Sequence, residues 1–201
     1  MVKTIIFDLG NVIVFVDHKR IIENLAKHSS LDKEGIEEFF KQSKARRDFE
    51  KGKVSEQQFF ENFKDNLDLR LDFHMFRKIW CSCFTGPNNE LEKIIYKLKK
   101  KYRLILLSNT DKIHFEYIFK KCKLLEIFDD YVLSYKAGYR KPNPMIFIKA
   151  IKKAKAAPSQ IVFIDDIYLF AAAAKMLGIH GIQYKTIRDL KNNLAARGVL
   201  V

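Results

Sequence analysis

Two adjacent aspartates, Asp165 and Asp166, come directly after the apolar residues 161–164 and give the clearest chemical signal in the sequence. Neighbouring carboxylates at the end of a buried strand repel each other unless a cation lies between them or nearby. Oxygen ligands of this kind suit Mg²⁺, which needs few protein ligands because it keeps several waters. We therefore interpret the pair as part of a metal site.

Three further groups of polar residues follow apolar segments or precede helices. Asp8 follows a short apolar run, where an aspartate can also serve as a turn or helix cap. Ser108 and Asn109 follow residues 103–107, and this position suits either a helix cap or the binding of an anion by a hydroxyl and backbone N–H groups. Lys141 lies in a loop before a helix pattern, where most lysines are solvated. None of the three is decisive alone.

The elements that must position these residues are predicted from the alternation of β-rich apolar segments with helical patterns. The strand-like segments are residues 3–8, 103–107, 131–134, 161–164 and 181–184. Helical patterns over residues 112–122, 143–154 and 168–177 separate the last four. This order predicts an α/β fold with a parallel sheet covered on both faces. Ligands bind beyond the carboxyl ends of such strands, so the four polar groups are expected to meet there.

Residues 17–84 contain helical patterns and no strand signal. The expected helices are residues 19–28, 33–44, 55–67 and 73–83. Ser55 and Gln58 form a capping-box pattern at the start of the third. The many phenylalanines of this stretch are interpreted as the packing of a small bundle. We expect a helical unit that lies over the strand ends as a lid.

Composition and charge limit the classes of function. The chain has 201 residues, and its 37 Lys and Arg against 24 Asp and Glu give a net charge of +13. We assign most of this excess to solvated faces of Lys-rich helices and expect no nucleic-acid binding, because no RNA-binding or zinc-finger pattern is present. No apolar run approaches the roughly 20 residues of a membrane span. Three cysteines and the lack of a leader pattern predict a cytoplasmic protein.

Taken in order, the motifs FDLGNV, LLSNT, RKPNP and FIDD resemble those of the haloacid dehalogenase-like hydrolase superfamily. The resemblance implies a Rossmann-like three-layer core formed by residues 1–16 and 85–201. It also implies a helical cap, residues 17–84, inserted after the first strand, as in capped subfamily IA. The first motif, together with Glu50 and Gly52 in the cap, is similar to the branch that contains alpha-D-glucose-1-phosphate phosphatase.

The resemblance implies an Mg²⁺-dependent phosphatase for a small phosphorylated metabolite, with a sugar phosphate as the finer expectation. Asp8 would attack phosphorus and form an aspartyl-phosphate that water then hydrolyses. The metal ligands implied by the family are Asp8, the carbonyl of Gly10, Asp166 and, in support, Asp165. The groups implied for the phosphoryl oxygens and the charged intermediate are Ser108, the backbone of Asn109, and Lys141.

Two positions depart from the family pattern and leave other functions open. Gly10 stands where most phosphatases of the superfamily have a second Asp that acts as general acid and base. Asp17 and His18 are the nearest substitutes, although we interpret both as the start of the first cap helix. Phe170 stands where relatives have Asn, which removes a polar group that could orient Lys141. The alternatives are an impaired relative that binds phosphate or a protein, and another chemistry on the same core, dehalogenation or phosphomutase activity.

Overall fold

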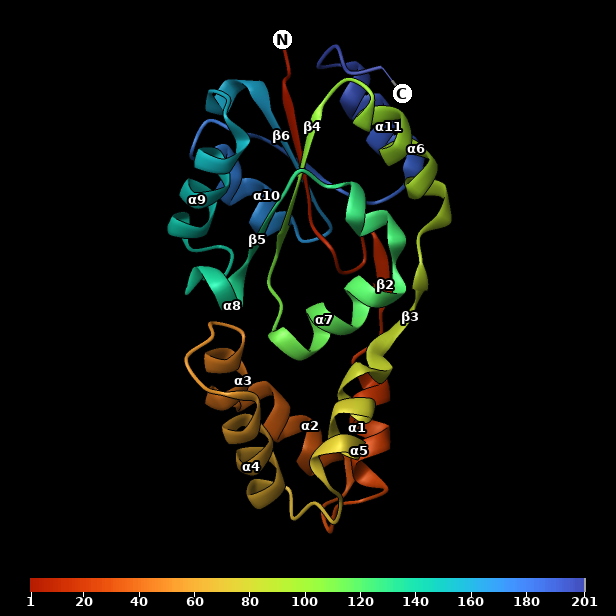
Figure 1. The fold of residues 1–201 in the computed structure, drawn as a ribbon, viewed down its shortest axis with the longest axis vertical. Coiled ribbons are helices and arrows are strands. Elements are labelled where there is room, and N and C mark those ends of the chain that lie inside the picture. The colour runs from red at the N-terminus through yellow and green to blue at the C-terminus, as the bar shows by residue number, and fades with distance from the viewer. Residues whose placement is uncertain (201) are drawn as a thin grey trace.

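The computed structural model of the chain describes residues 1–200 and contains a parallel sheet of five strands in the order β5-β4-β1-β6-β7 (Figure 1). The strands are β1 (Thr4–Phe7), β4 (Arg103–Ser108), β5 (Asp130–Leu133), β6 (Ile161–Asp165) and β7 (His180–Gln183). Each predicted strand is present, with ends that differ by at most one residue. In the register of the sheet, Phe7 pairs with Leu106 and Ile164. The motifs that follow these three residues therefore leave the sheet at the same edge.

Helices cover both faces of the sheet, as the predicted α/β fold requires. Side chains of α6 (Asn89–Lys99), α7 (Lys112–Lys121) and α11 (Ile187–Ala195) share one hydrophobic cluster with Ile5 and Phe7. Side chains of α9 (Pro144–Ala154) and α10 (Tyr168–Lys175) share another with Ile6. Successive residues of a strand point to opposite faces, so β1 contributes to both clusters. The short elements α8 (Ser134–Ala137), η2 (Lys123–Ile127) and η3 (Pro158–Gln160) complete this part of the chain.

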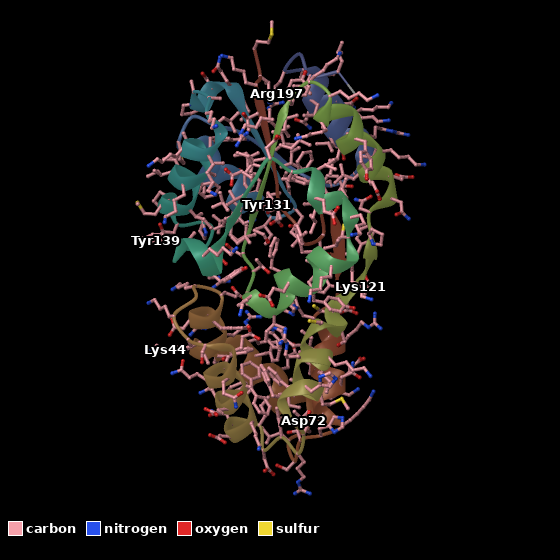
Figure 2. The ribbon with its side chains drawn as sticks, in the orientation of Figure 1. Lys44, Asp72, Lys121, Tyr131, Tyr139 and Arg197 are labelled. Atoms are coloured by element: carbon pink, nitrogen blue, oxygen red, sulfur yellow. The ribbon has the colours of Figure 1, made fainter. Side chains whose placement is uncertain are left out.

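A separate helical unit lies at the carboxyl-terminal edge of the sheet (Figure 1). It consists of α1 (Lys19–Ala26), α2 (Lys33–Gln42), α3 (Lys44–Phe49), α4 (Glu56–Asn66), α5 (Phe73–Trp80) and η1 (Cys81–Cys83). Its interior is a third hydrophobic cluster rich in aromatic rings, with Phe59 and Phe63 fully buried. Charged residues such as Lys44 and Asp72 lie on its outside (Figure 2).

The helical unit confirms some sequence predictions and corrects one. Ser55 and Gln58 form both hydrogen bonds of a capping box. The single helix expected over residues 33–44 is wrong, because the chain breaks at Ser43, which has φ −53° and ψ 110°. The Ser43 side chain accepts a hydrogen bond from the backbone N–H of Arg46 and begins α3 there.

The sequence did not indicate the two short strands through which the chain passes between the sheet and the helical unit. They are β2 (Val14–Val16) and β3 (Phe84–Pro87), which form a separate two-stranded antiparallel sheet. Segments this short contain too few residues to display an alternating pattern. Both connections between the two parts of the molecule therefore lie on one side (Figure 1).

Candidate active site

Lys141 contacts two of the other polar groups expected from the sequence, Asp8 and the aspartate pair. Its ammonium group donates hydrogen bonds to Asp8 Oδ1 at 2.7 Å, to Asp165 Oδ2 at 2.5 Å and to the Leu107 carbonyl at 3.2 Å. These contacts use all three ammonium hydrogens, and the residue is only 3% exposed. Buried charges of this kind are tolerated only when they are paired and hydrogen-bonded.

The two adjacent aspartates occupy different environments. Asp165 is fully buried, and its second oxygen accepts a hydrogen bond from the Ile167 backbone at 2.9 Å. Asp166 is partly exposed and lines the cavity described below. Carboxylate oxygens of Asp8, Asp165 and Asp166 lie within 4.8 Å of one another. Asp165 thus supports the cluster from behind, while Asp8 and Asp166 face the cavity.

The electrostatics of this cluster fit a divalent cation. Burial, together with the nearby Asp165, raises the pKa of Asp8 to about 7, although Lys141 opposes the rise. Burial and Asp165 also raise the pKa of Asp166. Three carboxylates and one ammonium group leave two formal negative charges in a confined space. A bound Mg²⁺ would neutralise them with the all-oxygen ligands that it prefers.

Asn109 has a structural contact that its motif did not reveal. Its side-chain oxygen accepts a hydrogen bond from the Lys141 backbone N–H at 2.7 Å, and its amide group donates one to the Lys141 carbonyl at 3.0 Å. The side chain therefore fixes the loop that carries Lys141. Ser108, which is buried and lines the same cavity, precedes it at the end of β4. The N-cap of α7 is not Ser108 but Asp111, three residues beyond it.

Phe170 contacts Lys141 in place of a polar group. The Lys141 nitrogen lies over the ring of Phe170, 5.1 Å from its centroid, and 5.5 Å from the centroid of Phe163. The negative face of an aromatic ring attracts an ammonium group. The expected loss of a polar group at position 170 is therefore accompanied by a cation–π contact that helps to hold the lysine.

These residues form the floor of a cavity of about 250 Å³ between the sheet and the helical unit. The floor includes Asp8, Ser108, Lys141 and Asp166 together with Gly10 and Phe170. The roof is formed mainly by residues of the helical unit, His18, Phe40, Arg46, Glu50 and Trp80. The lid expected from the sequence thus closes over the predicted site residues.

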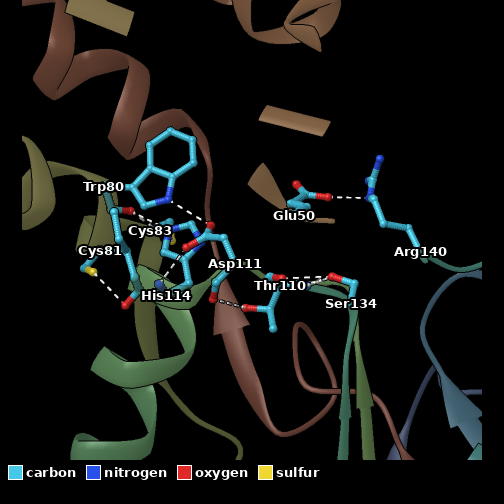
Figure 3. Close-up of polar contacts among 10 residues, drawn as sticks. Glu50, Trp80, Cys81, Cys83, Thr110, Asp111, His114, Ser134 and Arg140 are labelled. Carbon is cyan, nitrogen blue, oxygen red and sulfur yellow. Dashed lines mark hydrogen bonds and ion pairs between the residues drawn. The ribbon is translucent and has the colours of Figure 1, made fainter. Parts of the chain in front are cut away.

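One side of the roof is attached to the floor by an ion pair. Arg140 Nε lies 2.5 Å from Glu50 Oε2, and the two side chains approach from opposite parts of the molecule (Figure 3). Two residues beyond Glu50, Gly52 adopts a φ of +67°. A Cβ atom there would lie 2.1 Å from the Tyr135 carbonyl oxygen, so the turn can approach α8 only because this residue is glycine.

The other side of the roof is held by a buried network around Asp111. Its carboxylate accepts hydrogen bonds from Trp80 Nε1 at 3.0 Å and from the His114 backbone at 2.9 Å, and pairs with His114 Nδ1 at 2.9 Å (Figure 3). His114 Nε2 lies 2.8 Å from the Trp80 carbonyl. Both ring nitrogens therefore face acceptors, the arrangement that a protonated imidazole requires.

The charges of this pair reinforce each other. Burial alone would lower the pKa of His114, but the Asp111 carboxylate outweighs it and raises that pKa well above 6.5. Burial would raise the pKa of Asp111, whereas His114 lowers it below 3.8. The stabilisation from His114 is thus complete below pH 6.5 and is lost as the pH rises through the raised value. The stabilisation from Asp111 is lost as the pH falls through the lowered pKa of its carboxyl group.

We expect His114→Gln to lower the free energy of unfolding by about 3–5 kcal/mol at pH 6, because it leaves the Asp111 carboxylate buried without its partner. The difference from wild type should shrink towards alkaline pH, where His114 loses its proton. Urea unfolding at pH 6, 8 and 10 measures this trend. His74→Gln, at an exposed position of α5, is the control and should change the stability by less than about 0.5 kcal/mol. A difference that grows with pH would contradict the charge assignment.

The two candidate substitutes for the missing acid and base have different positions. Asp17 lies just before α1, and its side chain accepts a hydrogen bond from the Lys19 backbone N–H at 3.0 Å, so it takes part in the start of the helix. His18 is the N-cap residue of α1 and also lines the cavity. Desolvation of the imidazole ring, together with the positive charges of His114 and Arg46, lowers the pKa of His18 to about 4. The ring is therefore neutral at pH 7.

Comparison with known proteins assigns the chain to a family. The model of the haloacid dehalogenase-like hydrolases matches residues 2–178, and the chain therefore belongs to this family. It is 28% identical over 200 residues to D-ribitol-5-phosphate phosphatase from Bacteroides thetaiotaomicron, covering 96% of this chain and 97% of that protein.

Solved structures agree with this assignment. A HAD-family enzyme from B. thetaiotaomicron, crystallised with magnesium and inorganic phosphate, superposes with a TM-score of 0.82 at 29% identity over 92% of this chain and 95% of that one. A predicted HAD-like family hydrolase from Porphyromonas gingivalis gives a TM-score of 0.84 at 26% identity, over 96% of this chain and 98% of that one. The superfamily expected from the sequence is confirmed, whereas the glucose-1-phosphate phosphatase branch stays a prediction.

Proposed function

We propose that this protein is an Mg²⁺-dependent phosphatase that hydrolyses a small phosphorylated metabolite. The observation that carries the proposal is the buried Lys141 between Asp8 and Asp165, at the floor of a cavity that Asp166 also lines. A nucleophilic carboxylate, a cation that holds it and a second acidic group at a closed site are what phosphate-ester hydrolysis through a covalent intermediate requires.

Each residue then has a defined task. Asp8 attacks phosphorus, and Lys141 holds it in position and stabilises the charge of the phosphoryl group. Ser108 and the backbone of Asn109 bind phosphoryl oxygens. The residues that would hold Mg²⁺ are Asp8, the Gly10 carbonyl and Asp166, supported by Asp165. The ion supplies neutralisation of phosphate charge when it is bound.

The size of the cavity between the core and the cap supports a small substrate. We assign residues 1–16 and 85–201 to the core and residues 17–84 to the cap, because the two parts have separate hydrophobic clusters. A cavity of about 250 Å³ suits a metabolite of a few carbon atoms rather than a nucleotide or a protein. The similarity to a ribitol-phosphate phosphatase supports a sugar or polyol phosphate as the finer assignment.

The setting that we propose is cytoplasmic, in accord with the cysteines. Cys81, Cys83 and Cys122 are all buried and free. Unpaired buried thiols are typical of a reducing compartment. No helix within residues 1–200 has the length and apolar character needed to cross a membrane.

Hydrolysis of p-nitrophenyl phosphate tests the proposal directly. We expect turnover with Mg²⁺ and its loss in EDTA, with recovery when Mg²⁺ is restored, because the two excess negative charges of the site would otherwise repel the phosphate. The absorbance of the released p-nitrophenolate measures the rate. Phosphate affinity without turnover would overturn the proposal in favour of an impaired relative. Halide release from a haloacid without metal would favour dehalogenation.

Gly10→Asp tests whether proton transfer limits this enzyme. A Cβ atom at position 10 would meet only Val16 Cγ2 at 3.5 Å, an ordinary contact, so a side chain can be attached there without displacing the backbone. General acid–base catalysis contributes roughly 10²–10⁴-fold. We expect kcat for an alkyl phosphate, whose alkoxide leaves poorly, to rise by at least about tenfold.

The aryl ester supplies the control for this variant. p-Nitrophenolate leaves without protonation, so its kcat should change by less than about threefold. Gly10→Asn, of the same size but unable to donate a carboxylic proton, should give no gain with either ester. An equal gain for both esters would show that the new carboxylate acts through the metal site instead.

A further inference from the structure

Arg46 is the one cationic group of the cavity roof that has no anionic partner among residues 1–200. Its Nε atom is buried without a hydrogen-bond partner, although the residue lines the cavity. Its guanidinium carbon lies over the Phe40 ring, 5.7 Å from the centroid. A buried donor that lacks a partner is costly, so such a group in a binding cavity indicates a missing acceptor.

The surrounding charges do not neutralise it. Glu50 is paired with Arg140, and Asp111 is paired with His114. Arg46, Arg140 and His114 are positive, whereas Glu50 and Asp111 are negative. The groups around the roof therefore carry one excess positive charge. The same positive charges act on His18, because after desolvation of the ring His114 and Arg46 lower its pKa to about 4.

The cavity is therefore polarised, with negative charge at the floor and positive charge at the roof. From this we infer that Arg46 selects phosphate monoesters whose leaving group carries a carboxylate. The inference rests on the proposed function and specifies its substrate class. A neutral hydroxyl can accept the Nε hydrogen bond, but only an anion also neutralises the guanidinium charge. A planar carboxylate can also accept two parallel N–H bonds from it.

Two esters of the same carbon number test this preference. 3-Phosphoglycerate and glycerol 3-phosphate differ in a carboxylate that replaces a hydroxymethyl group. We expect kcat/KM to favour 3-phosphoglycerate by about 10- to 100-fold, the range for a hydrogen bond to a charged group. Ribonate 5-phosphate and ribitol 5-phosphate form a second pair with a longer chain, which should show the same direction.

Variants at position 46 assign the preference to this side chain. Arg46→Met keeps the length but removes the charge, and should reduce the ratio to about one. Arg46→Lys keeps the charge without the planar fork and should give an intermediate ratio. Arg47→Met is the matched control, because Arg47 is exposed and donates to the Gln42 carbonyl outside the cavity. It should leave the ratio at the wild-type value.

The outcomes separate this inference from the proposed function. If p-nitrophenyl phosphate is hydrolysed but wild type prefers the neutral esters, the role of Arg46 is wrong and the phosphatase assignment stands. A preference for the carboxylated esters that survives in Arg46→Met would equally overturn it. If no ester is hydrolysed, both proposals fail. The wild-type ratio does not depend on the folding of any variant.

Discussion

Asp8→Asn is expected to reduce kcat for any phosphate ester by about 10⁴-fold or more, the scale found when a covalent nucleophile is removed. The carboxamide has nearly the same shape, but it is a very poor nucleophile and carries no charge for the metal. Because Asn can still accept the hydrogen bond from Lys141, the floor of the cavity should keep its geometry. The loss therefore reports chemistry rather than folding.

Single-turnover and steady-state hydrolysis of p-nitrophenyl phosphate with saturating Mg²⁺ measure the effect. Thermal unfolding of the variant confirms that it is folded. Asp65→Asn, at an exposed position of α4, is the matched control and should keep the wild-type rate. Residual activity of the Asp8→Asn variant above about 1% would show that another residue attacks phosphorus.

Lys141→Met should damage both stability and catalysis. The substitution leaves Asp8 and Asp165 close together without the ammonium group that both contact, at 2.7 and 2.5 Å. Breaking a buried charge pair costs about 3–5 kcal/mol of unfolding free energy. Loss of a positioned charge that stabilises the phosphoryl group costs a further 10²–10³-fold or so in kcat.

The two effects can be measured separately because magnesium restores only one of them. Urea unfolding in EDTA reports the stability loss, and addition of Mg²⁺ should recover part of it by neutralising the carboxylates. The rate measured with saturating Mg²⁺ should stay low. Lys152→Met, at an exposed position of α9, controls for the loss of a lysine and should change neither quantity. Full recovery of the rate by Mg²⁺ would contradict the role of Lys141.

Sequence patterns predicted the part of the structure that depends on short-range order. Each sheet strand is a short apolar run, and its polar end follows within a residue or two, so Asp8, Ser108 and Asp165 could be placed at one edge. The parallel arrangement then follows from the helices between the strands. The strands β2 and β3 and the break at Ser43 have no such pattern and were missed. The helix α11 was missed although Leu190 and Leu194 have helical spacing and Thr186 caps its start.

The contacts that define the roof and the lysine loop could not be predicted because they join residues far apart in the chain. Asn109 was assigned through its backbone, whereas its side chain holds the backbone of Lys141, 32 residues away. Glu50 stands out in the sequence only through a family motif, and no residue near it in the chain indicates Arg140 as its partner. Side-chain direction across the cavity depends on packing between the two hydrophobic clusters rather than on local spacing.

The contact between Gly52 and the Tyr135 carbonyl affects how the substrate preference of this chain can be changed. The approach is between two backbones, so any residue other than glycine at position 52 would force the turn away from α8. Substitutions elsewhere that keep this contact therefore leave the distance between the turn and α8 unchanged. Libraries intended to change the leaving group should leave position 52 untouched and diversify the side chains that face inward from the roof, with position 46 first.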